Sequence, residues 1–174
     1  MVIVDKNELR NIGILKCFSE DDFCSLLPYI DIIQFKPGEF IIREGERGGG
    51  LFIIVDGKVD INKGIEGDSV TIATLEKGDF FGETDIISEG PRMASAIAKT
   101  ETSVANIKKE GMENIEKHHP TCSMKLYKVI AQILSKRLKN MDDEYLNLFL
   151  KTKGKKKINE LKTLREKLIK DWEI

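Results

Sequence analysis

The sequence reads Phe80-Phe81-Gly82-Glu83-Thr84-Asp85-Ile86-Ile87-Ser88-Glu89-Gly90-Pro91-Arg92-Met93-Ala94-Ser95 across one stretch, and this stretch decides how the fold is interpreted. Two aromatic residues lead into a Gly-Glu pair, and we expect a short helical turn through Ile86 and Ile87 to follow. The first amides of a helical turn carry a partial positive charge that attracts anions. Glycine at position 82 lets an anionic group approach the backbone closely. The stretch therefore predicts an anion-binding turn.

Glu83 and Arg92 are the charged pair of this stretch. Arg92 follows Pro91 in the rigid lead into the next strand, and its planar guanidinium matches two phosphate oxygens, which a lysine cannot do. Glu83 can accept a hydrogen bond from a sugar hydroxyl and can hold Arg92 in place. From the residues alone, a buried structural ion pair without a ligand is equally consistent, although such a pair is costly to desolvate.

Short apolar or alternating runs surround this stretch, and glycine turns close many of them. Many short strands at close spacing are typical of a small antiparallel barrel or jelly roll, although an open β-sandwich would give the same periodicity. Asp56-Gly57 predicts a two-residue hairpin, because that turn needs φ > 0. Residues 64–68 predict a longer hairpin loop. The predicted strands are Ile32–Phe35, Phe40–Arg43, Leu51–Asp56, Val59–Asn62, Val70–Leu75, Ala94–Lys99 and Val104–Ile107.

Helical patterns flank the strand region. Within residues 5–30, we expect Ser19 to open a helix whose first turn is acidic and whose apolar face carries Phe23, Leu26 and Leu27. A second helix is expected after Pro120, with Thr121 as its cap. We therefore predict a mainly β fold with flanking helices, in which a small antiparallel jelly-roll β-barrel precedes a long C-terminal helix.

The helix after Pro120 carries two apolar stripes. Leu126, Ile130 and Ile133 form one, which we expect to pack on the barrel. The other is a heptad seam of three repeats, which predicts a homodimer through residues 121–150; one broad face packed within the chain is the alternative. The seam comprises Tyr127, Ala131, Leu134, Leu138, Met141, Tyr145 and Leu148.

The chain after Leu150 changes character. The lysine-rich run Lys151–Lys157 is expected to be a solvated hinge, although it could attract phosphates. An amphipathic helix is expected from Ile158 to Trp172. The predicted segments are an N-terminal helical segment (1–30), the barrel (31–119), the long helix (120–150) and the hinge with the last helix (151–174).

Composition limits the class of protein. The net charge of −1 argues against general affinity for nucleic acid or anionic membranes. The N-terminus lacks the pattern of a signal peptide, and no run approaches the ~18 apolar residues of a membrane span. Three scattered cysteines suit a reducing compartment rather than a disulfide framework or a zinc site. We predict a soluble, cytoplasmic protein.

Phe81-Gly82-Glu83, followed by Pro91-Arg92-Met93-Ala94-Ser95, resembles the phosphate-binding cassette of the cyclic nucleotide-binding domain. That family includes regulatory subunits of cyclic-nucleotide-dependent kinases, cyclic-nucleotide-gated channels and bacterial catabolite activator proteins. The resemblance covers roughly residues 10–145. Its further glycine turns are Phe35-Lys36-Pro37-Gly38-Glu39, Arg43-Glu44-Gly45, Leu51-Phe52-Ile53-Ile54-Val55-Asp56-Gly57-Lys58-Val59 and Leu75-Glu76-Lys77-Gly78-Asp79-Phe80.

The resemblance implies a role for each matched position. Glu83 should bond the ribose 2′-hydroxyl, and Arg92 should bind the cyclic phosphate. The long helix should close over the base. The remaining ligand-binding residues are the cassette positions Gly82, Thr84, Asp85, Met93 and Ala94 and the apolar lining Ile61, Ile72 and Leu75.

The cassette departs from the family pattern at three residues. Thr84 and Asp85 stand where an aliphatic and a small residue are usual, and a carboxylate at position 85 would repel a phosphate. Met93 stands where cGMP-selective members often carry threonine, so the expected ligand is cAMP, with cGMP as a second possibility. A domain that keeps the fold but has lost the ligand is an alternative, with Asp85 as its support.

Two other classes of protein deserve comparison. A cupin-type metal enzyme needs histidines on the barrel strands, and His118 and His119 fall outside them. We therefore expect neither an enzyme, nor a metal, nor a cofactor beyond the nucleotide. A transcription regulator of the catabolite activator type needs a helix-turn-helix module beyond the long helix. Unless the chain is truncated, we expect no direct DNA binding, and signalling through an unknown effector protein.

Overall fold

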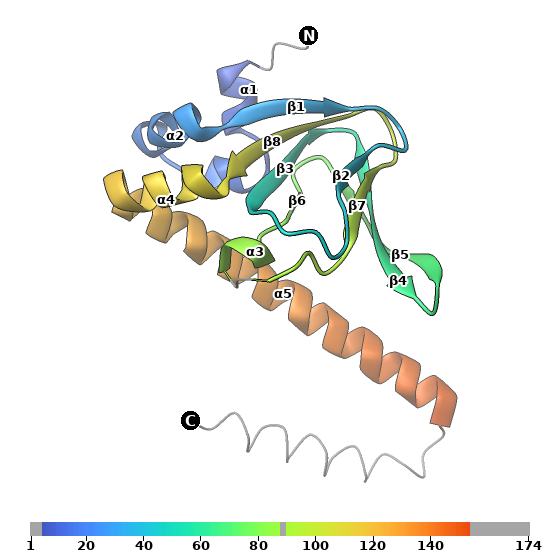
Figure 1. The fold of residues 1–174 in the computed structure, drawn as a ribbon. Helices are drawn as coiled ribbons and strands as arrows, with labels where there is room; N and C mark the ends of the chain where they lie inside the picture. Colours follow the sequence, from blue (N-terminus) through green and yellow to red (C-terminus); the bar gives the residue numbers. More distant parts are fainter. Residues whose placement is uncertain (1–4, 88–89, 154–174) are drawn as a thin grey trace. The chain divides into compact units, whose positions relative to one another are not determined.

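The computed structural model describes residues 5–87 and 90–153 (Figure 1). The chain divides into two compact units, Met1–Ile130 and Ala131–Ile174, and each is described by itself. The first unit holds the strands and most helices. The second holds the greater part of the long helix. The predicted helix Ile158–Trp172 lies outside the described residues.

Eight antiparallel strands of the described chain form two four-stranded sheets. One sheet has the order β1-β8-β3-β6, and the other has the order β2-β7-β4-β5. Successive strands thus alternate between the sheets, except for β4 and β5, which form a hairpin (Figure 1). This is the predicted jelly roll, and the open-sandwich alternative is not needed. The strands are β1 (Asp31–Phe35), β2 (Phe40–Ile42), β3 (Gly50–Asp56), β4 (Lys58–Ile65), β5 (Asp68–Glu76), β6 (Phe80–Phe81), β7 (Ser95–Ala98) and β8 (Thr102–Lys108).

The prediction of a hairpin at Asp56-Gly57 is wrong. The strands on either side belong to different sheets, because β3 pairs with β6 and β8 whereas β4 pairs with β5 and β7. Gly57 has a φ of +91°, and a Cβ there would lie 2.3 Å from the carbonyl oxygen of Glu101. Glycine is therefore required at a corner where the chain crosses between sheets, not at a hairpin turn.

The second predicted hairpin exists, but its loop is shorter than expected. Strands β4 and β5 pair through Ile65 and Asp68, which leaves a turn of two residues, Glu66 and Gly67. Both have positive φ, at 51° and 95°, as a type I′ turn requires. Glutamate rarely adopts the left-handed conformation that position 66 has, so the sequence Glu66-Gly67 did not indicate a tight turn.

The barrel interior is filled by apolar side chains from both sheets. β3 is buried on both faces along nearly its whole length, which explains its unbroken apolar run. One face of β3 is directed into the barrel, and the helices η1 (Gly13–Cys17) and α4 (Lys109–His118) contact the strand as well. The interior cluster comprises Ile42, Phe52, Ile54, Val59, Phe81, Ala96 and Val104, with Ile33, Phe35, Ile41, Ile61 and Leu75 packed against it.

Helical segments precede the barrel, as predicted. Ser19 caps α2, because its hydroxyl oxygen accepts the Asp22 amide at 3.3 Å. Phe23 and Leu26 are fully buried, whereas Leu27 is half-buried and opens the following 3-10 turn. The elements here are α1 (Lys6–Arg10), η1 (Gly13–Cys17), α2 (Glu20–Leu26) and η2 (Leu27–Tyr29).

The helices after the barrel are α4 (Lys109–His118) and α5 (Pro120–Lys153). Helix α5 begins at Pro120, so Thr121 is not its cap; the His119 carbonyl accepts the amides of Cys122 and Ser123 instead. Proline suits this first turn, where its missing N–H is not needed. The helix also continues to Lys153, three residues into the run that was expected to be a hinge.

The two stripes of α5 fall partly in each unit. In the first unit, Leu126 and Ile130 are fully buried, as expected of the stripe that packs on the barrel. In the second, the seam residues Leu138, Met141 and Tyr145 are exposed, and the side chain of Leu148 lies outside the described residues. Among the described helices, none is both long and apolar enough to cross a membrane.

Candidate functional site

The site begins where β6 ends. Phe81 pairs with Phe52 of β3, and the two buried rings stack with centroids 5.3 Å apart and planes 9° from parallel. Stacked rings of this kind contribute packing beyond their buried area. They fix the direction in which the chain leaves the barrel at Gly82.

Gly82 is the point of closest backbone approach. Its φ is +81°, and a Cβ there would lie 2.6 Å from the Gly50 carbonyl oxygen and 3.0 Å from Nη1 of Arg92. Both the backbone conformation and the space therefore require glycine. The sequence predicted that this glycine admits an anionic ligand, which stays a prediction; the groups that lie against it in the structure are the Gly50 carbonyl of β3 and the Arg92 guanidinium.

Glu83 follows at the start of a short helix, α3 (Thr84–Ile87). Glu83 is 7% exposed, and its carbonyl accepts the amides of Ile86 and Ile87 at 3.1 and 3.2 Å. The predicted helical turn is thus confirmed. Asp85 lies within this turn, but its side chain is outside the described part of the structure.

Arg92 lies ten residues after Gly82 in the sequence, and its side chain contacts that glycine. Arg92 is 8% exposed, and its Nη1 donates to the Gly82 carbonyl at 3.2 Å. The guanidinium carbon lies 5.9 Å from the centre of the Phe52 ring. A cation over an aromatic face gains electrostatic attraction. The structure therefore brings Gly82, Glu83 and Arg92 together as two buried charged residues around one glycine.

The backbone around Arg92 is held by the loop that precedes β3. The amide of Arg92 donates to the Glu46 carbonyl, and its carbonyl accepts the amide of Gly45, both at 2.9 Å. The Glu44 amide donates to the hydroxyl of Ser95, also at 2.9 Å. The lead into β7 is thus fixed by the Glu44–Glu46 loop, which the sequence did not assign to the site.

The apolar lining residues are less uniform. Ile61 and Leu75 pack against the barrel cluster. Ile72 is 57% exposed and is the extra residue of β5 where the pairing with β4 shifts register. Met93 is exposed and Ala94 is half-buried. Met93 and Ala94 lie in the cassette, and the other three lie on the β4–β5 hairpin.

Sequence reasoning missed Gly50 and Phe52. Both form direct surroundings of Gly82 and Arg92. The run Gly48-Gly49-Gly50, which immediately precedes an apolar strand, was the available signal, since consecutive glycines often mark close backbone approach.

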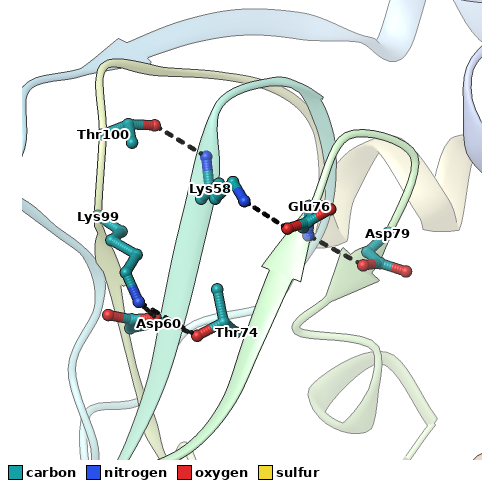
Figure 2. A network of polar contacts seen from close by, with 7 residues as sticks. All are labelled: Lys58, Asp60, Thr74, Glu76, Asp79, Lys99 and Thr100. Atoms are coloured by element: carbon teal, nitrogen blue, oxygen red, sulfur yellow. Dashed lines mark hydrogen bonds and ion pairs between the residues drawn. The ribbon is translucent and has the colours of Figure 1, made fainter.

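The outer face of the second sheet carries a separate polar network (Figure 2). Lys58 pairs with Glu76 at 2.6 Å, and Asp60 accepts bonds from Thr74 at 2.5 Å and from Lys99 at 3.1 Å. The bond from Thr74, and then that from Lys99, lowers the pKa of the Asp60 carboxyl. Lys58 and Asp60 alternate with the core residue Val59 along β4, so this network lies on the solvated side of the sheet.

Among the described residues, no group of three or more His, Cys, Asp or Glu side chains is placed so that it could hold a metal ion.

The fold and the cassette together define a jelly-roll domain with a buried Glu and Arg beside a glycine of positive φ. The chain belongs to the cyclic nucleotide-binding domain family, whose model matches residues 32–119. It is 38% identical to cGMP-dependent protein kinase 2 of Homo sapiens over 96 residues, which are 54% of this chain and 13% of the kinase. It is 36% identical to the cAMP-dependent protein kinase regulatory subunit of Yarrowia lipolytica over 80 residues, or 46% of this chain and 21% of that protein.

A solved structure is also similar. The cyclic nucleotide-binding domain from Methylobacillus flagellatus superposes with a TM-score of 0.71 at 26% identity, over 80% of this chain and 77% of that one. The matched region is thus a small part of the two kinase-related proteins but most of this bacterial domain. The chain carries a cyclic nucleotide-binding regulatory domain of the jelly-roll type.

Proposed function

We propose that this protein is a sensor that binds a cyclic nucleotide between Glu83 and Arg92 and acts as a regulator rather than a catalyst. The observation that carries the proposal is the burial of both charged side chains beside Gly82, with 7% and 8% of their surfaces exposed. Burying two charges is costly. A ligand with a sugar hydroxyl and an anionic phosphate would use the carboxylate and the guanidinium together.

In this proposal Glu83 accepts the ribose 2′-hydroxyl and Arg92 binds the cyclic phosphate, helped by amides around Gly82, Thr84 and Asp85. Ile61, Ile72 and Leu75 line the apolar side of the ligand. Met93 offers no hydroxyl to the guanine amino group, which favours cAMP over cGMP. Because the relatives include kinases named for each nucleotide, both ligands must be compared.

The signal would pass through α5. Its first turns belong to the same compact unit as the barrel, and Leu126 and Ile130 are buried there. Binding would pull the cassette inward through Arg92 and let the later turns repack against a second copy or an effector protein. A ligand shifts such an equilibrium only by its differential affinity for the two states.

Titration calorimetry with cAMP and with cGMP tests the binding step. We expect wild-type protein to bind, and Arg92→Ala to lose about 2–5 kcal/mol of binding free energy. Arg43→Ala is the matched control, because Arg43 is an exposed arginine that stacks 3.8 Å from the Phe40 ring near the same loop. No heat from either nucleotide at high micromolar concentration would leave a domain that keeps the fold without the ligand.

Sedimentation of the full chain tests the seam. Leu138→Asp and Met141→Asp introduce charges at two exposed seam positions, whereas Lys139→Asp changes charge beside them. We expect the two seam variants to sediment as monomers and the control as a dimer. Monomeric wild-type protein would remove the homodimer from the proposal.

A further inference from the structure

Lys63 connects the β4–β5 hairpin to the cassette. It lies on β4, and its ammonium donates to the backbone carbonyl of Met93, the residue directly after Arg92. The same ammonium pairs with Oε1 of Glu44 at 2.6 Å. One lysine thus joins three segments that are far apart in the sequence.

Glu44 completes the connection from the other side. Its second carboxylate oxygen, Oε2, accepts the amide of Gly64 at 2.9 Å. The bond from Lys63, followed by that from the Gly64 amide, lowers the pKa of the Glu44 carboxyl. The carboxylate is therefore charged at neutral pH and holds two consecutive residues of β4.

Both residues, together with the loop that begins at Glu44, contact the second half of the cassette. The loop that begins at Glu44 holds the amide and the carbonyl of Arg92 and the hydroxyl of Ser95. Lys63 holds the carbonyl between them, at Met93. Four attachment points thus follow one another along residues 92–95. The Lys63–Glu44 pair joins β4 to the loop that begins at Glu44, and these are the two elements that hold residues 92–95.

This pair does not belong to the buried group around Gly82. The side chains of Lys63 and Glu44 are 40% and 31% exposed, and a pair of this exposure contributes little to stability. Because the pair lies next to Arg92, it can contribute to ligand affinity instead. A site binds more tightly when its binding residue is already held in the bound geometry.

We propose that Lys63 and Glu44 are positioning residues, which set Arg92 for the anionic group of the ligand. Together they hold the chain that follows Arg92, at Met93 and Ser95, and they tie β4 to the loop whose Gly45 and Glu46 bond the Arg92 backbone. The proposal rests on the proposed function for its effect on affinity. Its effect on the backbone can be measured without any ligand.

The key variant is Lys63→Met, which keeps the length of the side chain and removes its charge. Lys58→Met is the matched control: Lys58 also lies on β4 and pairs with a glutamate, Glu76, at the same 2.6 Å, but on the outer face (Figure 2). Its pair is somewhat more exposed, at 49% and 61%. A general effect of losing an ion pair from β4 should appear in both variants.

Two measurements are compared. Hydrogen exchange of the Arg92 and Gly45 amides in ligand-free protein reports how firmly the cassette backbone is held. Titration with cAMP and cGMP reports affinity. We expect Lys63→Met to speed both exchange rates and to weaken binding roughly three- to tenfold, the size of one ordinary hydrogen bond. Lys58→Met should change neither, and Lys63→Arg, which keeps the charge, should restore most of the affinity.

Equal behaviour of Lys63→Met and Lys58→Met in both measurements would overturn the proposal. So would faster exchange with unchanged affinity, because the held backbone would then be irrelevant to the ligand. If wild-type protein binds neither nucleotide, the proposed function fails. The exchange comparison then still decides whether Lys63 holds Arg92.

Discussion

Gly82 and Arg92 are packed against each other at the centre of the site: Nη1 of Arg92 donates to the Gly82 carbonyl at 3.2 Å, and a Cβ on Gly82 would lie 3.0 Å from that nitrogen. The glycine and the arginine stand at opposite ends of the cassette in the sequence. Because they touch, a change at either end is expected to move the other.

Gly82→Ala should therefore damage both stability and binding. A left-handed conformation costs a residue with a side chain about 1–2 kcal/mol. The new methyl group would also lie 2.6 Å from the Gly50 carbonyl oxygen, so the backbone or Arg92 must shift. We expect the free energy of unfolding, measured with urea, to fall by more than the conformational cost alone. We also expect calorimetry to show weaker nucleotide binding.

Gly38→Ala separates the two contributions. Gly38 has nearly the same φ, +86°, but apart from its own chain neighbours no described residue has an atom within 4 Å of a Cβ placed there. In this variant the free energy of unfolding should fall only by the conformational cost, and nucleotide binding should match that of the wild type. Equal losses of stability in the two variants would mean that the cassette yields to the methyl group without strain.

Much of the barrel could be predicted from the sequence because its signals are local. Seven of the eight described strands lie within a few residues of the predicted ranges, since alternation and glycine turns act over short distances. The missed strand, β6, has only two residues, Phe80 and Phe81, and was interpreted as the lead into the site. Glu83 and Arg92 were predicted as ligand-binding residues from a motif; the structure buries both, with Arg92 bonded to Gly82, and their binding role stays a prediction.

The remaining features depend on contacts between distant segments. Asp56-Gly57 has the local chemistry of a hairpin, but β3 finds its partners in β6 and β8, so tertiary pairing overrides the local signal. Phe52 and Gly50 join the site only because β3 passes beneath Gly82. No spacing in the sequence indicates that Lys63 reaches Met93, thirty residues away.

Glu66→Asn is expected to stabilise the protein. Glu66 is the one described residue other than glycine with positive φ, at 51°, and it precedes Gly67 in a two-residue turn. Asn-Gly is strongly preferred in such turns, because asparagine tolerates the left-handed conformation. We expect the free energy of unfolding in urea to rise by about 0.5–1 kcal/mol. Glu46→Asn, outside any positive-φ position, should leave it unchanged, and an equal rise there would refute the explanation.

Asn106→Leu is expected to stabilise the ligand-free protein as well. Asn106 is 6% exposed, and within the described residues its buried Oδ1 has no hydrogen-bond partner. Leucine has a similar shape and no group to satisfy, so we expect the free energy of unfolding to rise by about 1 kcal/mol. The free energy of unfolding should rise less in Asn62→Leu, because that substitution also removes the hydrogen bond that the Asn62 amide nitrogen donates to Ser69 at 3.4 Å. A loss of stability in Asn106→Leu would indicate a buried water on Oδ1 in solution.

Because Cys122 is buried, we expect the free energy of unfolding to fall in alkaline solution. Its buried thiol lies 3.6 Å from the carbonyl oxygen of Asp22, and burial, followed by the Asp22 charge, raises its pKa to about 11 from 9.0. The unfolded chain therefore releases this proton first as the pH rises. The contribution to stability is complete below about pH 9 and is lost as the pH rises towards 11.

Urea unfolding at several pH values between 8 and 11 measures this loss, and Cys122→Ser removes the group that titrates while keeping a small buried donor. We expect a shallower decline in Cys122→Ser than in the wild type. Cys17→Ser, at an exposed cysteine, should follow the wild type. Tyr127, whose pKa is raised by burial and by its bond to Glu116, is present in all three proteins and does not affect the comparison. Parallel declines in all three would show that the Cys122 thiol titrates alike in the folded and unfolded chain.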